Sequence, residues 1–210
     1  TKQALYDKAE SLYLRALAIR KKALVPNRRS IATLLNNLAL IYSNQFKYNK
    51  AKSLFEQALH IREDVLGLEH RETATTLNNL ALTYRQQGLY NKAEPLYLRG
   101  LAIREKVLGD EHPRTAFILN NLAMLYQYQG LYGKAEPLAR RVLDIRLTVI
   151  QRQAPYLALS DRQIFVRSLG NAFQIAFSSA ARGDSGAELA MFSRLNRQGL
   201  LEEIEKRQAQ

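Results

Sequence analysis

The chain has 210 residues, of which 31 are Lys or Arg and 19 are Asp or Glu, so its formal net charge is +12. It has no cysteine, which excludes disulfide bonds, cysteine-ligated metals and thiol nucleophiles within these residues. No apolar run approaches the roughly 20 residues that a membrane-spanning helix needs, and no secretory signal stands at the start. We therefore expect a cytoplasmic protein with no membrane partner.

One short motif recurs at a constant interval. NNLALIY, NNLALTY and NNLAMLY begin at residues 36, 78 and 120, so each copy starts 42 residues after the previous one. Half a period before the first copy, Tyr6, Ala9, Ile19 and Arg20 fall on matching positions. Because such periods mark repeat architectures, we predict a half repeat at 1–28 and full repeats at 29–70, 71–112 and 113–150.

Each repeat is predicted to form two helices. In the middle unit Leu77, Leu80, Ala81 and Tyr84 recur at spacings of three and four, which places them on one helical stripe. Gly88 is expected to end that helix, since glycine readily adopts positive φ. The second helix is expected to run from a capping pair formed by Asn91 and Glu94 to Gly109, with Asp7 and Glu10 as the matching pair of the half repeat. Pro95 and Pro137 then fall in or just after the first turn, where a missing N–H costs least.

Small and large residues alternate where the paired helices should approach. The expected close contacts are Ala39 with Ala51, Ala81 with Ala93 and Ala123 with Ala135, with Tyr42, Tyr84 and Tyr126 filling the space beside them. A single hairpin of this kind cannot bury its own apolar face, but stacked hairpins can. The sequence therefore predicts an all-α, right-handed α-α superhelix.

The repeated residues resemble the tetratricopeptide repeat, a helix–turn–helix unit. The usual unit has about 34 residues; this one is longer, and the stretch LNNLA…Y…QGLYNKAEPLYLRGLAIREKVLGDEHP at 77–113 is similar to the kinesin light chain type. The resemblance covers about residues 4–150. It implies a scaffold that binds protein partners.

Beyond residue 150 the register fails. Arg162 and Gln163 stand one period after Asn120 and Asn121, although the segment still reads as helical. We expect 151–210 to be either a divergent capping pair or a linker to a further domain. LAMFSRLNRQGLLEE resembles the segment that joins such repeats to the caspase-like CHAT domain of bacterial proteins.

The sequence offers no recognisable catalytic site. The three histidines, His60, His70 and His112, have no second ligand at metal spacing, and no phosphate-binding loop is present. His70 and His112 precede helix starts in consecutive units, so we assign them loop or capping roles. We expect no enzyme, no metal and no cofactor.

The basic charge leaves a second function open. Arg20, Arg62, Arg104 and Arg146 recur once per unit near the end of each second helix, where a cation complements the helix dipole. The same charge attracts nucleic acid, and helical repeats can read RNA. A nucleic-acid-binding array is therefore the alternative to a peptide-binding scaffold.

Helical geometry places the paired asparagines. With Leu77, Ala81 and Tyr84 on the buried stripe, about 100° per residue turns Asn79 to the opposite side, which in a superhelical array faces the concave groove. An amide offers both donors and an acceptor, as an extended peptide backbone requires. The resemblance implies the same role, because tetratricopeptide repeats hold bound peptides through asparagines at matching places. The groove is predicted to contain Asn37, Asn79 and Asn121, with Asn36, Asn78 and Asn120 either beside them or hydrogen-bonded between helices.

The flanking residues differ between units, as expected if they select a sequence. They are Thr33, Thr75 and Phe117; Leu40, Leu82 and Met124; and Asn44, Gln86 and Tyr128, with Arg85 adding positive charge. The expected ligand is therefore a protein or peptide segment with acidic or aromatic residues. Two alternatives stay open: all six asparagines form a structural ladder without a ligand, and the first helix packs against a second copy of the chain.

Overall fold

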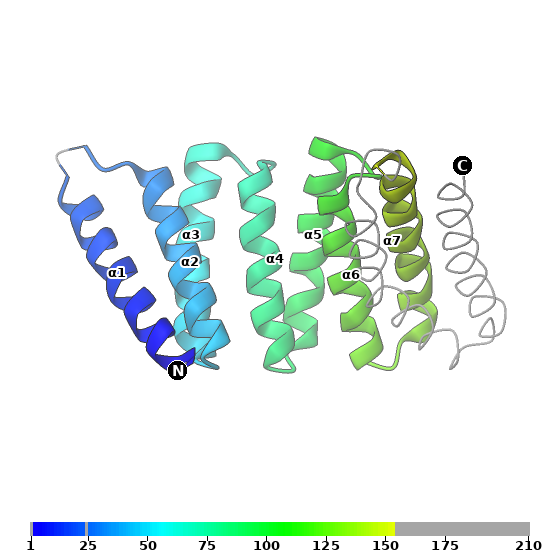
Figure 1. Cartoon of the computed structure of the whole chain (residues 1–210), viewed down its shortest axis with the longest axis horizontal. Coiled ribbons are helices and arrows are strands. Elements are labelled where there is room, and N and C mark those ends of the chain that lie inside the picture. The colour runs from blue at the N-terminus through cyan, green and yellow to red at the C-terminus, as the bar shows by residue number, and fades with distance from the viewer. Residues whose placement is uncertain (1, 24, 154–210) are drawn as a thin grey trace, which may run out of the picture. The chain divides into compact units, whose positions relative to one another are not determined.

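The computed structural model describes residues 2–23 and 25–153, which form seven α-helices and no strand (Figure 1). The helices are α1 (Lys2–Lys22), α2 (Arg28–Asn44), α3 (Tyr48–Leu66), α4 (Arg71–Gln86), α5 (Tyr90–Leu108), α6 (Pro113–Tyr128) and α7 (Tyr132–Gln153). The chain divides into two compact units, Thr1–Asp110 with α1 to α5 and Glu111–Gln210 with α6 and α7. The predicted all-α repeat fold is confirmed, whereas the expectations for residues 154–210 lie outside the described residues.

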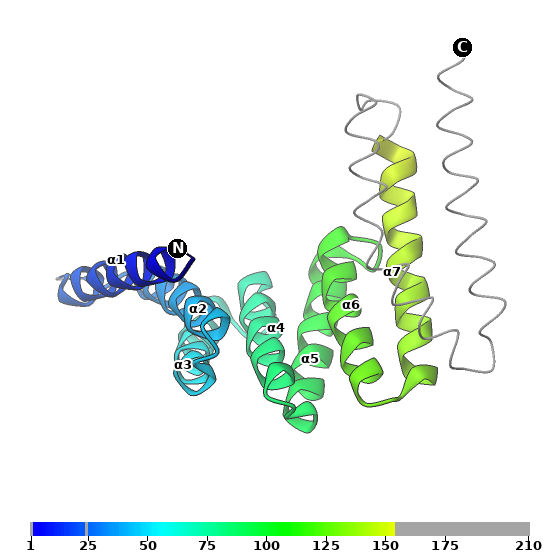
Figure 2. The same cartoon turned by 60° about the horizontal axis from the view of Figure 1, so that its bottom comes forward.

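Consecutive helices pair into hairpins. Helix α2 packs on α3, α4 on α5 and α6 on α7, and within the first unit α1 packs on α2 and α3 on α4 (Figures 1 and 2). In the first unit each hairpin buries its apolar stripe partly between its own two helices and partly against the neighbouring hairpin. One such cluster joins Ala74 and Leu77 of α4 to Ile103 of α5, with Leu59 of α3 packed against them.

The small and large residues predicted for the hairpin contacts are buried in all three hairpins. Ala39, Ala51, Ala81, Ala93, Ala123 and Ala135 have no exposed surface, and Tyr42, Tyr84 and Tyr126 are buried beside them. The Tyr42 hydroxyl donates to Glu10 of α1 at 2.8 Å, and the Tyr84 hydroxyl donates to Glu56 of α3 at 3.3 Å. Each tyrosine in the first unit therefore fills its own hairpin and also ties it to the preceding helix.

The helix starts are capped differently from the sequence expectation. The roles assigned to His70 and His112 are confirmed, because each Nδ1 accepts the backbone N–H two residues on. The capping pair at Asn91 and Glu94 is wrong: α5 begins at Tyr90 after Leu89, with no side-chain cap. The reason is the short turn, in which the Leu89 N–H already donates to Tyr84 and its carbonyl accepts from Ala93.

Two further expectations about helix starts are corrected. Asp7 and Glu10 lie inside α1, which begins at Lys2. Pro95 lies just after the first turn of α5, as predicted, but at this place its missing N–H removes one helical hydrogen bond. The predicted helix ends are confirmed: α4 gives way to Gly88 and α5 ends directly before Gly109.

The turns within the three hairpins share one geometry but not one residue type. At each, the N–H of one residue donates to a carbonyl three back and the next N–H to a carbonyl five back, as in a Schellman motif. Gly88 and Gly130 occupy the left-handed position with φ of 74° in both, but Phe46 occupies it in the first hairpin with φ of 62°. A side chain in this conformation is strained by about 1–2 kcal/mol.

We therefore expect Phe46→Gly to raise the free energy of unfolding by about 1 kcal/mol, since it removes the left-handed penalty. The matched change Gly88→Ala should lower it by about 1 kcal/mol, because a Cβ there meets no atom within 4 Å and backbone strain is the only cost. Urea denaturation followed by circular dichroism measures both. Loss of stability in Phe46→Gly would contradict this account of the turn.

A second expectation concerns Tyr97, which takes the place that Phe55 has one unit earlier. Its side chain has no exposed surface, and its hydroxyl has no hydrogen-bond partner among the described residues. Burial raises its pKa above the ordinary value. An unpaired buried hydroxyl costs about 1–3 kcal/mol, so Tyr97→Phe should raise the melting temperature. Phe55→Tyr should lower it, and the opposite order would show that the Tyr97 hydroxyl is stabilised.

Candidate peptide-binding surface on the first helices

The paired asparagines of α2 and α4 form a continuous line of hydrogen bonds, which we call the amide ladder. Asn78 Nδ2 donates to Asn79 at 3.4 Å, Asn79 Nδ2 to Asn36 at 3.2 Å and Asn36 Nδ2 to Asn37 at 3.3 Å. Asn37 Nδ2 then donates to the Tyr13 hydroxyl of α1 at 3.4 Å. The ladder therefore crosses three helices of the first unit.

The members of the ladder differ in exposure. Asn36 and Asn78 are each only 4% exposed, whereas Asn37 and Asn79 are half-buried. This is the order that helical geometry predicted. It also means that the interhelical bond joins a buried amide of one helix to a half-buried amide of the next.

Helix α6 departs from this order. Asn121 is only 6% exposed, whereas Asn120 is half-buried and donates to Met124 Sδ at 3.7 Å along its own helix. The expectation that Asn121 is the more exposed member of its pair is therefore wrong. The predicted row of accessible amides is present on α2 and α4 but not on α6.

A line of polar contacts, the polar seam, joins α2 to α4. Its three rungs are the Arg29–Glu72 ion pair, the Asn36–Asn79 hydrogen bond and the Ser43–Gln86 hydrogen bond of 2.9 Å. Buried Thr83 lies 3.3 Å from the Ser43 hydroxyl. Along each helix the rungs are seven residues apart, so they lie on one side after about two turns.

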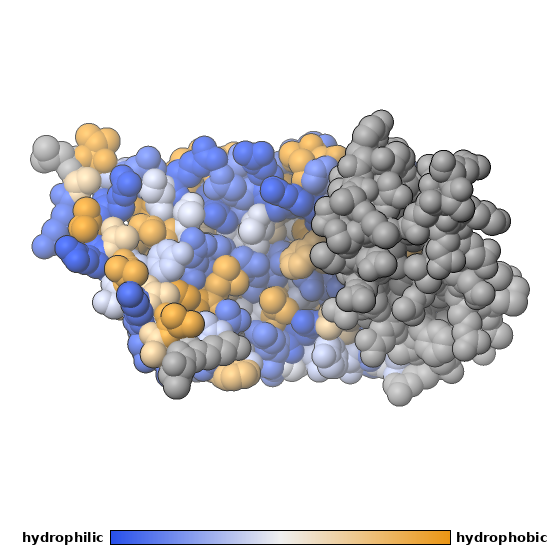
Figure 3. Space-filling view, in the orientation of Figure 1, coloured by the Kyte–Doolittle hydropathy of each residue, from blue (hydrophilic) through white to orange (hydrophobic). Residues whose placement is uncertain are grey.

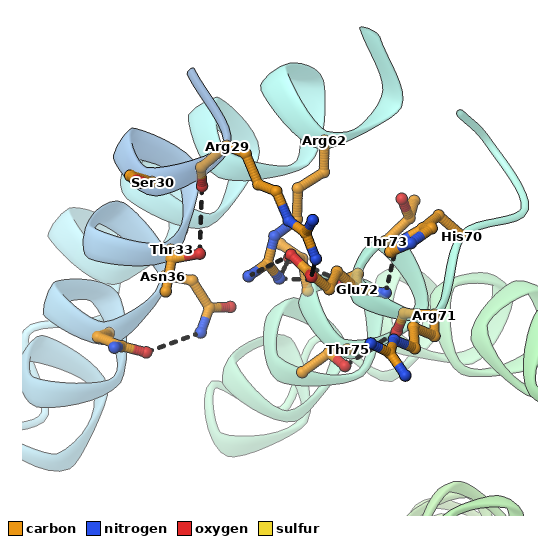
Figure 4. Close-up of polar contacts among 12 residues, drawn as sticks. Arg29, Ser30, Thr33, Asn36, Arg62, His70, Arg71, Glu72, Thr73 and Thr75 are labelled. Atoms are coloured by element: carbon orange, nitrogen blue, oxygen red, sulfur yellow. Dashed lines mark hydrogen bonds and ion pairs between the residues drawn. The ribbon is translucent and has the colours of Figure 1, made fainter. Parts of the chain in front are cut away.

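One end of the seam is a charged cluster around Glu72 (Figure 4). Arg62 of α3 is only 5% exposed and donates to the Glu72 backbone carbonyl at 2.8 Å and to the Thr76 hydroxyl. Its Nη2 lies 3.7 Å from the Glu72 carboxylate, which Arg29 approaches from α2. Burial alone would raise the pKa of Glu72, but Arg29, then Arg62 and His70, hold it below the ordinary value.

The repeated arginines therefore have a different role from the expected one. Arg62 does not cap its own helix but lies buried between α3 and α4, and burial lowers its pKa. Arg104 is also buried, and its Nη2 donates to the Thr75 hydroxyl of α4. The physical reason is that carbonyl and hydroxyl oxygens of the adjacent first helix lie within reach of the long side chain.

The flanking positions are accessible to different degrees. Leu40, Leu82, Met124, Arg85 and Thr75 are half-buried, whereas Thr33, Asn44, Gln86, Phe117 and Tyr128 are exposed. Of these, Met124, Phe117 and Tyr128 belong to the second unit. In Figure 3 the visible side of the first unit is mainly hydrophilic, and hydrophobic residues gather along α1, where Leu5, Leu12 and Ile19 are more than half exposed.

Two kinds of feature are absent from the described residues. Residues 2–23 and 25–153 contain no group of three His, Cys, Asp or Glu side chains suited to a metal ion. In the same part of the chain no helix is long and apolar enough to cross a membrane. Helical hairpins that repeat along the chain, with buried alanines in each and a polar seam in the first unit, define the class of protein: a helical repeat scaffold.

Comparison with known sequences gives the family. The tetratricopeptide repeat family matches residues 1–64, 30–106 and 72–148, and the chain belongs to that family. No curated protein matches the chain. The family is typically non-enzymatic and binds protein partners.

Solved structures of similar fold include kinesin light chain-like proteins. The crystal structure of BtubC (BKLC) from P. vanneervenii is 24% identical, with a TM-score of 0.75 over 95% of this chain and 76% of that one. A putative kinesin light chain from Podosopora anserina with nearly identical TPR-like repeats is 25% identical, with a TM-score of 0.61 over 99% and 89%. MamA is 14% identical, with a TM-score of 0.60 over 98% and 94%. The matches carry no sign of a CHAT domain.

We expect Glu72→Gln to lower the free energy of unfolding at pH 7 by about 2 kcal/mol, because it leaves the buried Arg62 charge without its carboxylate. Since the folded-state pKa of Glu72 lies below its ordinary value of 4.5, the ionised group stabilises the fold above that value. The contribution is lost as the pH falls through the folded pKa. The advantage of the native chain over the variant should therefore shrink below about pH 4.5.

The control is Glu69→Gln, which removes a carboxylate that is 63% exposed and paired with Lys106. Exposed pairs contribute about 0–1 kcal/mol, so this variant should change little. Urea titrations at several pH values measure both variants. Equal losses would show that burial of the Glu72 cluster has no special effect.

Proposed function

We propose that the chain is a protein-interaction module that holds an extended peptide segment of a partner against the first helices of its repeats. The main support for this proposal is that Asn37 and Asn79 are half-buried and that the amide ladder on α2 and α4 fixes their side chains. A ligand group that is already ordered loses less entropy on binding.

The hydrogen-bond capacity of these two amides supports the proposal. A side-chain amide has two N–H donors and an oxygen with two acceptor sites. In the ladder Asn79 donates once to Asn36 and accepts once from Asn78, and Asn37 donates once to Tyr13 and accepts once from Asn36. Each therefore keeps one donor and one acceptor site, which is what one residue of an extended peptide backbone requires.

The surroundings give the proposed ligand its chemistry. Leu40 and Leu82 present half-buried apolar surface, and Arg85 adds a cation on α4. With a net charge of +12, these residues favour a segment with acidic residues and an aromatic or aliphatic side chain. The equivalent positions of α6 in the second unit hold Met124 and Tyr128, which is 63% exposed, and the proposed surface is confined to α2 and α4 of the first unit.

The ladder does not exclude this role. Asn36 and Asn78 act as the structural members that hold α2 and α4 in register, and Asn37 and Asn79 act as both structural and binding members. We propose a cytoplasmic scaffold rather than an enzyme, in keeping with the family and with the kinesin light chain-like neighbours in fold. None of the matches reported above supports the nucleic-acid alternative.

The test compares two ways of breaking the same rung. Asn79→Ala removes the half-buried amide, and Asn36→Ala removes its buried partner but leaves the Asn79 amide in place. Labelled acidic peptides with one aromatic residue, followed by fluorescence anisotropy, should show affinity about tenfold weaker for Asn79→Ala. Arg85→Glu should weaken binding of the same peptides by roughly fivefold or more.

Comparing Asn79→Ala with Asn36→Ala separates the loss of an amide that binds the peptide from the loss of an amide that only stabilises the helix packing. Asn36→Ala should reduce stability at least as much as Asn79→Ala, since Asn36 is the more buried. It should weaken binding less than Asn79→Ala, because it releases Asn37 and Asn79 from the ladder without removing either amide. Unchanged affinity in both Asn79→Ala and Arg85→Glu would rule out the proposed surface. An equal loss in Asn79→Ala and Asn36→Ala would show that the ladder is structural alone.

A further inference from the structure

The turn between α2 and α3 differs from the other two hairpin turns at two adjacent positions. Phe46 stands where the others have Gly88 and Gly130, and Lys47 stands where they have Leu89 and Leu131. The Phe46 side chain is 75% exposed although its backbone is strained, with φ of 62°. Its ring contacts the Tyr48 ring edge-on, with the centroids 6.2 Å apart, but most of the side chain stays in solvent. A strained and mostly exposed aromatic residue points to contact with another molecule.

A recess of about 460 Å³ lies beside this turn, between α1, α2 and α3. We call it the α2–α3 recess, and its apolar wall consists of Leu14, Leu17, Leu38 and Leu54 with Tyr42. Its size falls within the range of about 300–1,000 Å³ that is usual for ligand sites. It shares none of its residues with the asparagine surface described above.

The rim of the recess is cationic. The Lys50 Nζ lies 5.3 Å from the centre of the Tyr42 ring, and the Lys47 Nζ lies 5.7 Å from it. Lys50 also lines the recess, so Tyr42 and its two cations connect the recess to the turn. The nearby carboxylate of Glu10 accepts the Tyr42 hydroxyl.

The next hairpin does not repeat this surface. The position of Leu14 is taken one period later by Glu56, and the carboxylate of Glu56 accepts the Tyr84 hydroxyl. The turn there has Gly88 in place of an aromatic residue. The equivalent place thus presents a carboxylate where the first hairpin presents a leucine, although Lys92 still lies 5.9 Å from the Tyr84 ring.

We propose that the α2–α3 recess and turn form a second docking surface, for a partner segment that places one large apolar side chain next to carboxylates. The apolar side chain enters the recess against Leu14 and Leu54. The carboxylates pair with Lys47 and Lys50, and the ring of Phe46 covers the segment from the turn. Apolar burial gives this contact its affinity, and charge complementarity gives it its selectivity.

The probes are fluorescein-labelled twelve-residue peptides with one Leu, Phe or Trp flanked by Asp and Glu. Two control sets carry Lys in place of the acidic residues or Ala in place of the apolar one. Fluorescence anisotropy should show binding of the first set and none of the controls. Lys50→Glu and Leu14→Glu should each weaken the affinity roughly tenfold, through charge reversal and through a carboxylate in the recess.

The Phe46→Gly variant distinguishes a lost binding contact from a general loss of folding. It should weaken peptide binding several-fold even though the melting temperature rises by roughly 2–4 °C. The matched control is Lys92→Glu, which reverses the charge at the same place of the next hairpin and should leave the affinity unchanged. Because the asparagine surface can take the same peptides, the titrations are repeated in an Asn79→Ala, Arg85→Glu background, in which the effects of Lys50→Glu and Phe46→Gly should persist.

Three results would overturn the docking surface. The first is that no peptide of the acidic set binds at concentrations up to about 1 mM, which corresponds to roughly 4 kcal/mol of binding free energy. The second is that Lys92→Glu weakens binding as much as Lys50→Glu, since this would show general attraction to a basic protein. The third is that Asn79→Ala removes binding while Phe46→Gly and Lys50→Glu do not, which would leave the asparagine surface as the site of the interaction.

Discussion

The close approach of the two helices within each hairpin is the constraint on which the rest of the structure depends. Fully buried alanines, such as Ala39 on α2 and Ala51 on α3, leave no room for larger side chains at the crossing. The tyrosine one turn further along then fills the space beside them, and in the first unit its hydroxyl reaches the preceding second helix. Since a single hairpin cannot bury its remaining apolar face, this geometry also requires neighbours. The 42-residue period is therefore a packing requirement repeated along the chain.

Stacking by apolar contact alone would leave neighbouring hairpins free to slide, and polar contacts remove that freedom. The buried guanidinium of Arg62 on α3 contacts a carbonyl, a hydroxyl and a carboxylate of α4. The polar seam joins α2 to α4 at three levels, and the amide ladder continues from its middle rung to α1. Buried polar groups are costly when unpaired, so a shift of one hairpin past another would break several contacts at once. The polar interior thus specifies the register of the first unit.

The same contacts prepare the surface for binding. Asn37 and Asn79 are held in place by their neighbours and keep hydrogen-bond capacity, so a peptide backbone meets groups that are already ordered. At the turn between α2 and α3, by contrast, the proposed binding residue lowers stability. Phe46 has a left-handed backbone conformation there, which glycine adopts without strain. Departures from the repeat, rather than the repeat itself, mark the positions where one hairpin differs from the next in what it can bind.

The sequence by itself determined the helical hairpins, their period, the buried alanine and tyrosine positions and the histidine caps, because these depend on local periodicity and on residues close in the chain. It also gave the order of burial within the asparagine pairs of α2 and α4. Only the tertiary structure decided what the repeated arginines do, since Arg62 contacts a helix that the sequence pattern cannot place within its reach. It also decided that Asn121 is buried and that Asn36 bonds to Asn79. These outcomes depend on the rotation and offset of neighbouring helices, and a spacing in the sequence fixes neither.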